Sequence, residues 1–286
     1  MSNQIVAVDI NIPGIRAAIV DNDTKTIQAG TEISEKISAD ETLENFLDIW
    51  TKVITKVHSL RESPISKFGI TIPGPFDYEN GISLMHNQRK FESLYNVNVK
   101  ELLAERLGIS TLNIRMANPA PQSIKAEEMI GAAKGYKSIL GFTLNYGLGS
   151  AHILNGVTHD AYLWNKPFKD GIAEDYIGIG WLTKRYEEFT GIHASDIKEL
   201  TSLASTDDGI GQLVFNEYGE NFVKFLLQHI NHFNPDCLLI GGHSNAWDLF
   251  IDHVRDRLSD KDIKIPIIGA SLGSAATLIG GADLWS

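Results

Sequence analysis

The stretch that decides the fold reads Gly69-Ile70-Thr71-Ile72-Pro73-Gly74-Pro75-Phe76-Asp77-Tyr78-Glu79-Asn80-Gly81-Ile82. The run Lys67-Phe68-Gly69-Ile70-Thr71-Ile72, which is rich in β-branched residues, predicts a strand. Pro73-Gly74-Pro75 must end this strand, because proline cannot donate to a strand ladder and glycine permits a sharp turn. The other elements are assigned outward from this point.

The first half of the chain predicts a mixed lobe with the order β-β-β-α-β-α-β. The elements expected around the central strand are a hairpin of Ile5–Ile10 and Ile15–Val20, a third strand over Thr26–Glu32, a helix over residues 43–60 capped by Ser38 or Asp40, a helix over Val99–Leu107 that ends at Gly108, and a strand over Leu112–Met116. The hairpin follows from the break at Pro13-Gly14 between two apolar runs.

The second half begins in the same way and predicts a second lobe. The expected elements are strands over Ser138–Leu144 and Ala151–Leu154, helices over Tyr176–Gly191 and Ile210–Phe233, a strand over Cys237–Ile240, a helix over Asn245–Leu258, a strand over Ile265–Ile268 and a helix over Ser271–Leu284. Aligned on the start of the chain, Asn145 falls on Asn11, which is a weak internal repeat. We therefore expect an α/β protein with lobes at 1–117, completed by 271–286, and at 118–270, meeting across a cleft.

Composition narrows the classes of function. Charged residues number 25 basic and 36 acidic, a net charge of −11, which repels nucleic acid and anionic lipid surfaces. No apolar run approaches the ~18 residues of a membrane span, and no signal peptide precedes the first strand. The one cysteine, Cys237, lies in an apolar run and predicts a buried core residue. The expectation is a cytoplasmic protein that binds neither nucleic acid nor membrane.

Four stretches together resemble one family. They are residues 69–82, Glu174–Gly191, Asn234–Gly242 and Leu272–Ala282. They are similar to the ROK family (repressors, open reading frames and kinases) of the actin-like, hexokinase-type ATPase superfamily. The resemblance implies a two-lobed actin-like ATPase fold, ribonuclease H-like, with a central cleft. It also implies a homodimer and transfer of the ATP γ-phosphoryl group to a sugar hydroxyl with the help of magnesium.

The resemblance implies where a nucleotide would bind. The family's first phosphate loop reads Asp-x-Gly-Gly-Thr-Lys, and this chain has Asp9-Ile10-Asn11-Ile12-Pro13-Gly14 there. The second loop, Leu-Gly-Thr-Gly-Ile-Gly-Gly, becomes Leu144-Asn145-Tyr146-Gly147-Leu148-Gly149-Ser150, and Gly241-Gly242 resembles the adenosine-side turn. The candidate nucleotide contacts are thus Asp9, Asn11, Asn145, Gly147, Gly149, Gly241 and Gly242.

The catalytic stretch departs from the family. Kinases of the family read Asn-Asp-Ala-Asn, whereas this chain reads Asn118-Pro119-Ala120-Pro121. Pro119 therefore occupies the position of the general base, and no catalytic residue is assigned. Loss of a general base costs about 10²- to 10⁴-fold in rate. Glu127 or Glu128 would be the nearest replacements, at least a helical turn away.

The sugar side is altered as well. Asn118 and Asn87 match family positions near the sugar, but residues 157–171 lack the family's Gly-Glu-x-Gly-His pattern. They contain no cysteine, so neither a zinc site nor any other metal site is expected. His159-Asp160 reads as an exposed polar turn or as a new acid–base pair. Trp164 and Tyr162 either fill the space of the missing loop or form a platform for a sugar ring.

Three functions remain open at this point. The first is a degenerate homologue that has lost phosphotransfer and binds a sugar or another small ligand. The alternative is an active ATP- and magnesium-dependent hexose or amino-sugar kinase with relocated catalytic groups. A regulatory protein that signals to a partner is the third, and DNA binding by this acidic chain is not expected.

Overall fold

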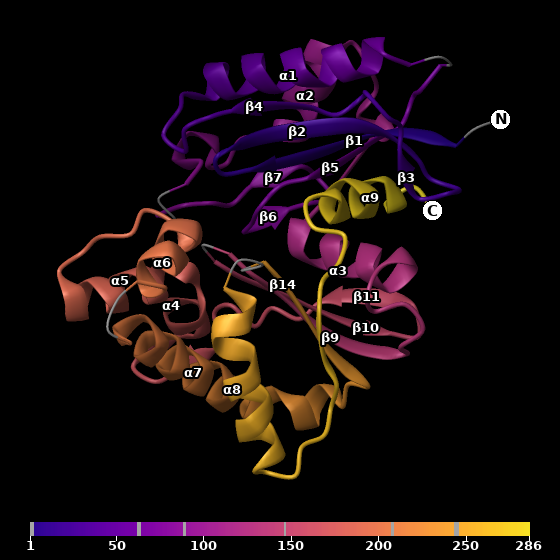
Figure 1. Cartoon of the computed structure of the whole chain (residues 1–286). Coiled ribbons are helices and arrows are strands. Elements are labelled where there is room, and N and C mark those ends of the chain that lie inside the picture. The colour runs from indigo at the N-terminus through magenta and orange to yellow at the C-terminus, as the bar shows by residue number, and fades with distance from the viewer. Residues whose placement is uncertain (1–2, 62–63, 88–89, 146, 207–208, 243–245) are drawn as a thin grey trace. The chain divides into compact units, whose positions relative to one another are not determined.

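The computed structural model describes residues 3–61, 64–87, 90–145, 147–206, 209–242 and 246–286. The chain forms two compact units, one of Met1–Ala126 with Ser274–Ser286 and one of Glu127–Gly273. We call them unit 1 and unit 2. Each is a sheet with helices packed on it (Figure 1).

Unit 1 is built on a sheet in the order β3-β2-β1-β5-β8, with β4 also paired to β2. Its strands and α-helices are β1 (Gln4–Asn11), β2 (Gly14–Asp21), β3 (Thr26–Ile27), β4 (Ile33–Lys36), α1 (Leu43–Ser59), β5 (Phe68–Thr71), β6 (Phe76–Asp77), β7 (Ile82–Ser83), α2 (Val99–Leu107), β8 (Ile114–Ala117), the first part of α3 (Pro119–Ile130) and α9 (Ala275–Asp283). Strands β1, β5 and β8 run parallel, so their carboxyl ends meet at one edge of the sheet.

Both faces of β1 are buried. Successive side chains of a strand point to opposite faces, so they join different cores. Val6, Val8 and Ile10 join the core under α1, whereas Ile5 and Ala7 join a second core under α9. Figure 1 shows α9 in yellow lying against the strands of the indigo sheet. The approach is close, since a Cβ atom at Gly69 of β5 would lie 2.0 Å from the carbonyl oxygen of Gly281 in α9.

Unit 2 has a five-stranded sheet in the order β11-β10-β9-β14-β15. Its elements are β9 (Ser138–Leu144), β10 (Leu148–Leu154), β11 (Val157–Asp160), β12 (Pro167–Phe168), β13 (Gly171–Ile172), α4 (Ala173–Ile177), α5 (Ile179–Thr190), α6 (Ile197–Ala204), α7 (Ile210–Phe233), β14 (Cys237–Gly242), α8 (Trp247–Ser259) and β15 (Ile267–Gly269). Strands β9, β14 and β15 are parallel, and α7 contributes much of the buried core.

Several expected elements are confirmed and others are corrected. Helices Val99–Leu107 and Ile210–Phe233 lie where the pattern places them. The strand expected over residues 26–32 is shorter, because β3 ends at Ile27 and pairing with β2 resumes only at β4, beyond the expected range. Thr42 caps α1, its hydroxyl accepting from the Asn45 N–H, in place of the expected Ser38 or Asp40.

The remaining differences concern helix ends and the boundary between units. The helix expected over 176–191 is two helices, because Gly178 adopts an extended conformation between α4 and α5. Asn245, the expected start of the next helix, lies outside the described residues. The structure divides the chain within α3, at Ala126/Glu127, and not at 117/118. The early part of α3 stays with unit 1, since Gly280 of α9 packs closely on the Gln122 backbone.

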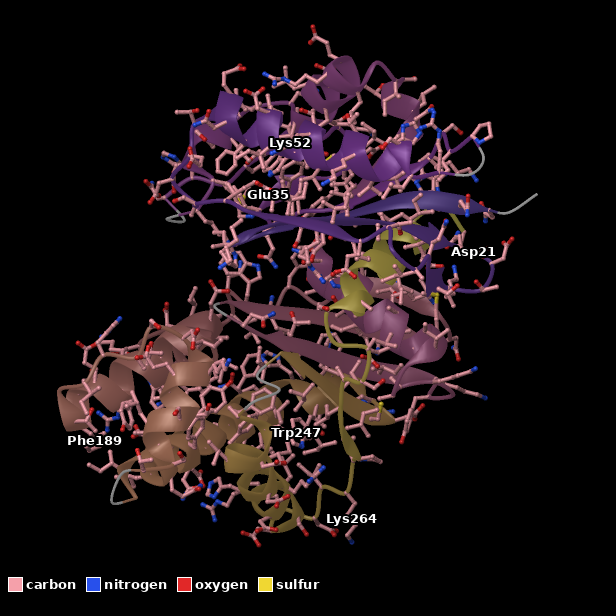
Figure 2. All side chains as sticks on the ribbon, turned by 45° about the horizontal axis from the view of Figure 1, so that its top comes forward. Asp21, Glu35, Lys52, Phe189, Trp247 and Lys264 are labelled. Carbon is pink, nitrogen blue, oxygen red and sulfur yellow. The ribbon has the colours of Figure 1, made fainter. Side chains whose placement is uncertain are left out.

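Unit 1 has a long, exposed ion pair between α1 and β4. Figure 2 labels Lys52 on α1 and Glu35 on β4, whose charged groups lie 3.9 Å apart and are largely exposed. Such a pair contributes little to stability, because water screens it. In the described part of the chain, no helix is both long and apolar enough to cross a bilayer.

Candidate functional site

The carboxyl edge of the unit 1 sheet gathers two of the predicted site residues. Asp9 of β1 stands in register with Thr71 of β5, which stands in register with Ala117 of β8. Asn118 directly follows β8 at the same edge. The fold therefore brings Asp9 and Asn118, which are far apart in sequence, to the same edge of the sheet, with the end of β5 between them.

Asp9 is almost fully buried, and both oxygens of its carboxylate have partners within the protein. Oδ1 accepts from the Thr71 hydroxyl at 3.0 Å, and Oδ2 accepts from the Thr277 hydroxyl of α9 at 2.9 Å. Oδ2 also forms a 2.8 Å ion pair with Nη2 of Arg16. Both oxygens of this candidate nucleotide contact are thus bonded within unit 1.

Arg16 is a site residue that the sequence analysis missed. It lies on β2 directly opposite Asp9. The sequence did not predict this pairing, because the register requires the two-residue loop Ile12-Pro13 and the expected break lay at Pro13-Gly14. The same Nη2 atom lies 2.8 Å from the Ser274 carbonyl oxygen, which draws the start of α9 into the network.

The residues of the β1–β2 hairpin loop have local structural roles. Asn11 is exposed, and its side-chain oxygen accepts from the Ile12 N–H at 2.9 Å. Gly14 is required by the sheet, because a Cβ atom there would lie 2.2 Å from the carbonyl oxygen of Glu35 in β4. Gly14, the glycine of the predicted first phosphate loop, allows the pairing of β2 with β4, and the Asn11 contact with a nucleotide stays a prediction.

Pro119, which is predicted to occupy the position of the family's general base, lies at the start of a helix. Pro119 is the first residue of α3, and the Asn118 side-chain oxygen accepts from the Ala120 N–H at 3.0 Å. Asparagine is a preferred N-cap, and proline is favoured at the first helical position because its missing N–H would have no helical partner there. Residues 118–120 therefore have the chemistry of a helix cap.

Glu127, one of the two alternative bases, is a structural residue. It is 1% exposed. Oε1 accepts from the backbone N–H groups of Ser271 and Leu272, both at 2.7 Å. Oε2 accepts from the Ala132 N–H at 2.8 Å and from the Ser271 hydroxyl at 3.0 Å. A carboxylate with four internal donors is not available to a substrate hydroxyl.

The predicted nucleotide residues of unit 2 share one edge of its sheet. Gly241 and Gly242 end β14 in register with Thr143 and Leu144 of β9, and Gly149 of β10 is paired with Thr143 from the other side. Asn145 and Gly147 lie in the turn between β9 and β10. The structure thus brings all five together, while Tyr146 lies outside the described residues.

Two of these positions have clear packing requirements. Gly242 has φ +76°, and a Cβ atom there would lie 2.1 Å from the Leu144 carbonyl oxygen. Gly147 faces Glu174 of α4, whose Oε2 accepts from the Leu148 N–H at 2.8 Å. Glu174 is a second residue that the sequence analysis did not assign to the site, and only its position in the 174–191 resemblance pointed to it.

Comparison with known proteins decides the family. The sequence profile of the ROK family matches residues 5–161, more than half of the chain.

The chain belongs to the ROK family.

The relatives agree with this assignment. A glucokinase of Thermotoga maritima is 23% identical over 327 aligned positions, covering 98% of this chain and 96% of the relative. A ROK family glucokinase from Streptomyces griseus, solved with glucose and AMPPNP, superimposes with a TM-score of 0.78 at 20% identity, covering 98% of each chain. A ROK hexokinase from Thermus thermophilus gives 0.77 at 18% identity, covering 98% of this chain and 97% of the hexokinase. The expected two-lobed actin-like ATPase fold is confirmed.

The structure around His159-Asp160 differs from both interpretations of this pair. Residues 157–160 form strand β11 and not a turn, so neighbouring side chains point to opposite faces and do not form a pair. His159 is exposed and lies across from His152. Asp160 accepts from the Tyr162 N–H at 2.8 Å, and burial raises the pKa of its carboxyl.

The aromatic residues that follow have separate environments. Trp164 packs against the unit 2 core, which supports the space-filling interpretation for this residue. Tyr162 is 62% exposed, with φ 49°. Asn87 is exposed in unit 1, where its backbone N–H donates to Glu92, and its contact with a sugar stays a prediction. Among the described residues, no group of three His, Cys, Asp or Glu side chains could hold a metal ion.

Proposed function

We propose that this chain is a ROK sugar kinase homologue that has lost phosphotransfer and serves as a sugar-binding or regulatory protein. The observation that carries the proposal is Pro119 at the first position of α3, where the family's kinases carry the catalytic aspartate. A general base must lie within hydrogen-bond reach of the hydroxyl that it deprotonates. The side chain of proline has no atom that accepts a proton.

The residues beside Pro119 do not replace the base. Asn118 is held as a helix cap, and an amide does not accept a proton at neutral pH. Residues 116–124 contain no Asp or Glu. The expected loss of about 10²- to 10⁴-fold therefore has no local compensation.

The alternative of a relocated base meets a second obstacle at Glu127. Its carboxylate is buried and accepts four hydrogen bonds from Ser271, Leu272 and Ala132. Using it as a base would require breaking these bonds and exposing the group to substrate. This supports loss of activity over relocation to Glu127.

A binding role fits what the chain retains. The resemblance to the family suggests Asn118 and the glycine-bearing edge of unit 2 as ligand contacts, and the Streptomyces griseus relative was solved with glucose and AMPPNP. We propose a sugar as the ligand class and a homodimer as the assembly. Binding raises apparent stability by mass action, so a thermal-shift screen against hexoses, amino sugars and adenine nucleotides measures it.

The decisive experiment is a coupled ADP-release assay with ATP, magnesium and a panel of hexoses and amino sugars, with a ROK glucokinase as positive control. We expect no sugar-dependent ADP release from this chain. Clear sugar-dependent turnover would refute the proposal and favour an active kinase.

A further inference from the structure

Asp9 and Arg16 form a partly buried ion pair at the edge of unit 1 where the resemblance to the family places the first phosphate loop of a magnesium-dependent reaction. Their side chains are 6% and 24% exposed. We propose that the guanidinium of Arg16 replaces the divalent cation at Asp9, so that any ligand bound at this edge is held without magnesium. The inference goes beyond loss of the base, because it concerns metal dependence and rests on different residues.

The Asp9 carboxylate does not fit a magnesium ion. Magnesium requires near-octahedral oxygen ligands at about 2.0–2.1 Å and is usually held by carboxylates together with substrate phosphates. Oδ2 of Asp9 already accepts from Arg16 at 2.8 Å and from Thr277 at 2.9 Å, and Oδ1 accepts from Thr71 at 3.0 Å. A cation that displaced these donors would stand beside a positive guanidinium and be repelled by it.

Arg16 is fixed in this position from several sides. β2 places it across from Asp9, and α9 supplies the Ser274 carbonyl at 2.8 Å and the Thr277 hydroxyl at 3.0 Å. Nη1 reaches the exposed Glu32 at 3.5 Å. The guanidinium therefore links β1, β2 and α9, and it is a structural partner of Asp9.

In a partly buried ion pair of this kind, the effects of the two substitutions on stability should be coupled. Removing one partner leaves an uncompensated buried charge, whereas removing both leaves none. Asp9→Asn and Arg16→Met should each destabilise unit 1, and the double variant should cost much less than their sum. Water-screened charges such as Lys52 and Glu35, 3.9 Å apart in the same unit, should show no such coupling.

The first test is a pair of double-mutant cycles measured by urea unfolding of the full chain. For Asp9→Asn and Arg16→Met we expect a coupling of about tenfold or more in the folding equilibrium constant. The control cycle, Glu35→Gln with Lys52→Met, should be additive. Additive effects at Asp9 and Arg16 would overturn the inference. Arg16→Lys, which keeps the positive charge, should fold even if Asp9→Asn does not and should be less destabilised than Arg16→Met.

The second test measures metal binding directly. Mn²⁺ is titrated into the wild type and followed by electron paramagnetic resonance, with and without ATP. We expect binding no tighter than in the Asp9→Asn/Arg16→Met double variant. One Mn²⁺ per wild-type chain, displaced by magnesium and lost in the double variant, would overturn the inference.

These outcomes are separable from the kinase assay. Sugar-dependent ADP release that survives removal of the Asp9 carboxylate would refute the proposed loss of activity and leave the role of Arg16 intact. Conversely, an inactive chain that binds Mn²⁺ through Asp9 would refute the role of Arg16 alone.

Discussion

Replacing Glu127 by glutamine tests whether this buried carboxylate is a structural clamp or a hidden catalytic group. The substitution keeps the size of the side chain and one oxygen acceptor. It replaces the other oxygen by an NH₂ group, which donates. Two of the four donors that now reach Glu127 would then face another donor.

The magnitude follows from those two lost bonds. A donor left without an acceptor costs about 1–3 kcal/mol, and bonds to a charged group lie toward the upper end. The donors are only partly buried, so water can solvate them in part. We expect Glu127→Gln to lower the free energy of unfolding by about 2–4 kcal/mol, a large share of the ~5–15 kcal/mol of a typical domain.

The assay is urea unfolding followed by circular dichroism, with hydrogen exchange of the backbone amides of Ala132, Ser271 and Leu272 as the local readout. Glu105→Gln, at an exposed position of α2, is the matched control and should change stability by less than about 0.5 kcal/mol. Unchanged stability and unchanged protection of these amides in Glu127→Gln would refute the clamp. Loss of sugar-dependent turnover at unchanged stability would identify Glu127 as a base.

Three further outcomes are expected. Gly242→Ala should destabilise unit 2 by about 2–4 kcal/mol in urea, because it combines a left-handed φ with a clash on the Leu144 carbonyl, whereas Gly156→Ala, which has open space, should cost only about 1–2 kcal/mol. Burial raises the pKa of the Cys237 thiol to about 12, so only the unfolded thiol ionises as pH rises above about 8.5. The free energy of unfolding should therefore fall as pH rises above that value, and iodoacetamide should label the thiol only in urea. Burial and two neighbouring histidines lower the pKa of His152, so the unfolded state takes up the proton first as pH falls. Thermal stability should therefore fall as pH drops below about 6.5, and His152→Gln should reduce this dependence of stability on pH. A wild-type stability that is level across these pH ranges would contradict both titration arguments.

Local sequence signals predicted the elements that depend on local interactions. The helix Val99–Leu107 ends where Gly108 can adopt the left-handed conformation, and α7 ends before Pro235. Strands β3 and β4 were harder to predict, because a short edge strand is defined by its pairing with β2 and not by its own pattern.

Some features of the candidate site are likewise visible in the sequence, and others depend on the tertiary structure. Pro119 and the altered loops are visible in the sequence, since they are departures from a known pattern. The roles of Arg16 and Glu127 are not visible there, because both depend on partners more than 140 residues away, at Ser274 and at Ser271. A charged residue shows its role only when the groups around it are known.

The sequence alone determined the family and the absence of a carboxylate at position 119, because both depend only on which residues occupy the aligned positions. The tertiary structure decided how the remaining charges are used. It paired Asp9 with Arg16 through the hairpin register and enclosed Glu127 with backbone donors from the segment before α9. Whether a carboxylate can act on a ligand depends on whether its lone pairs and the surrounding space are free, and folding alone determines both.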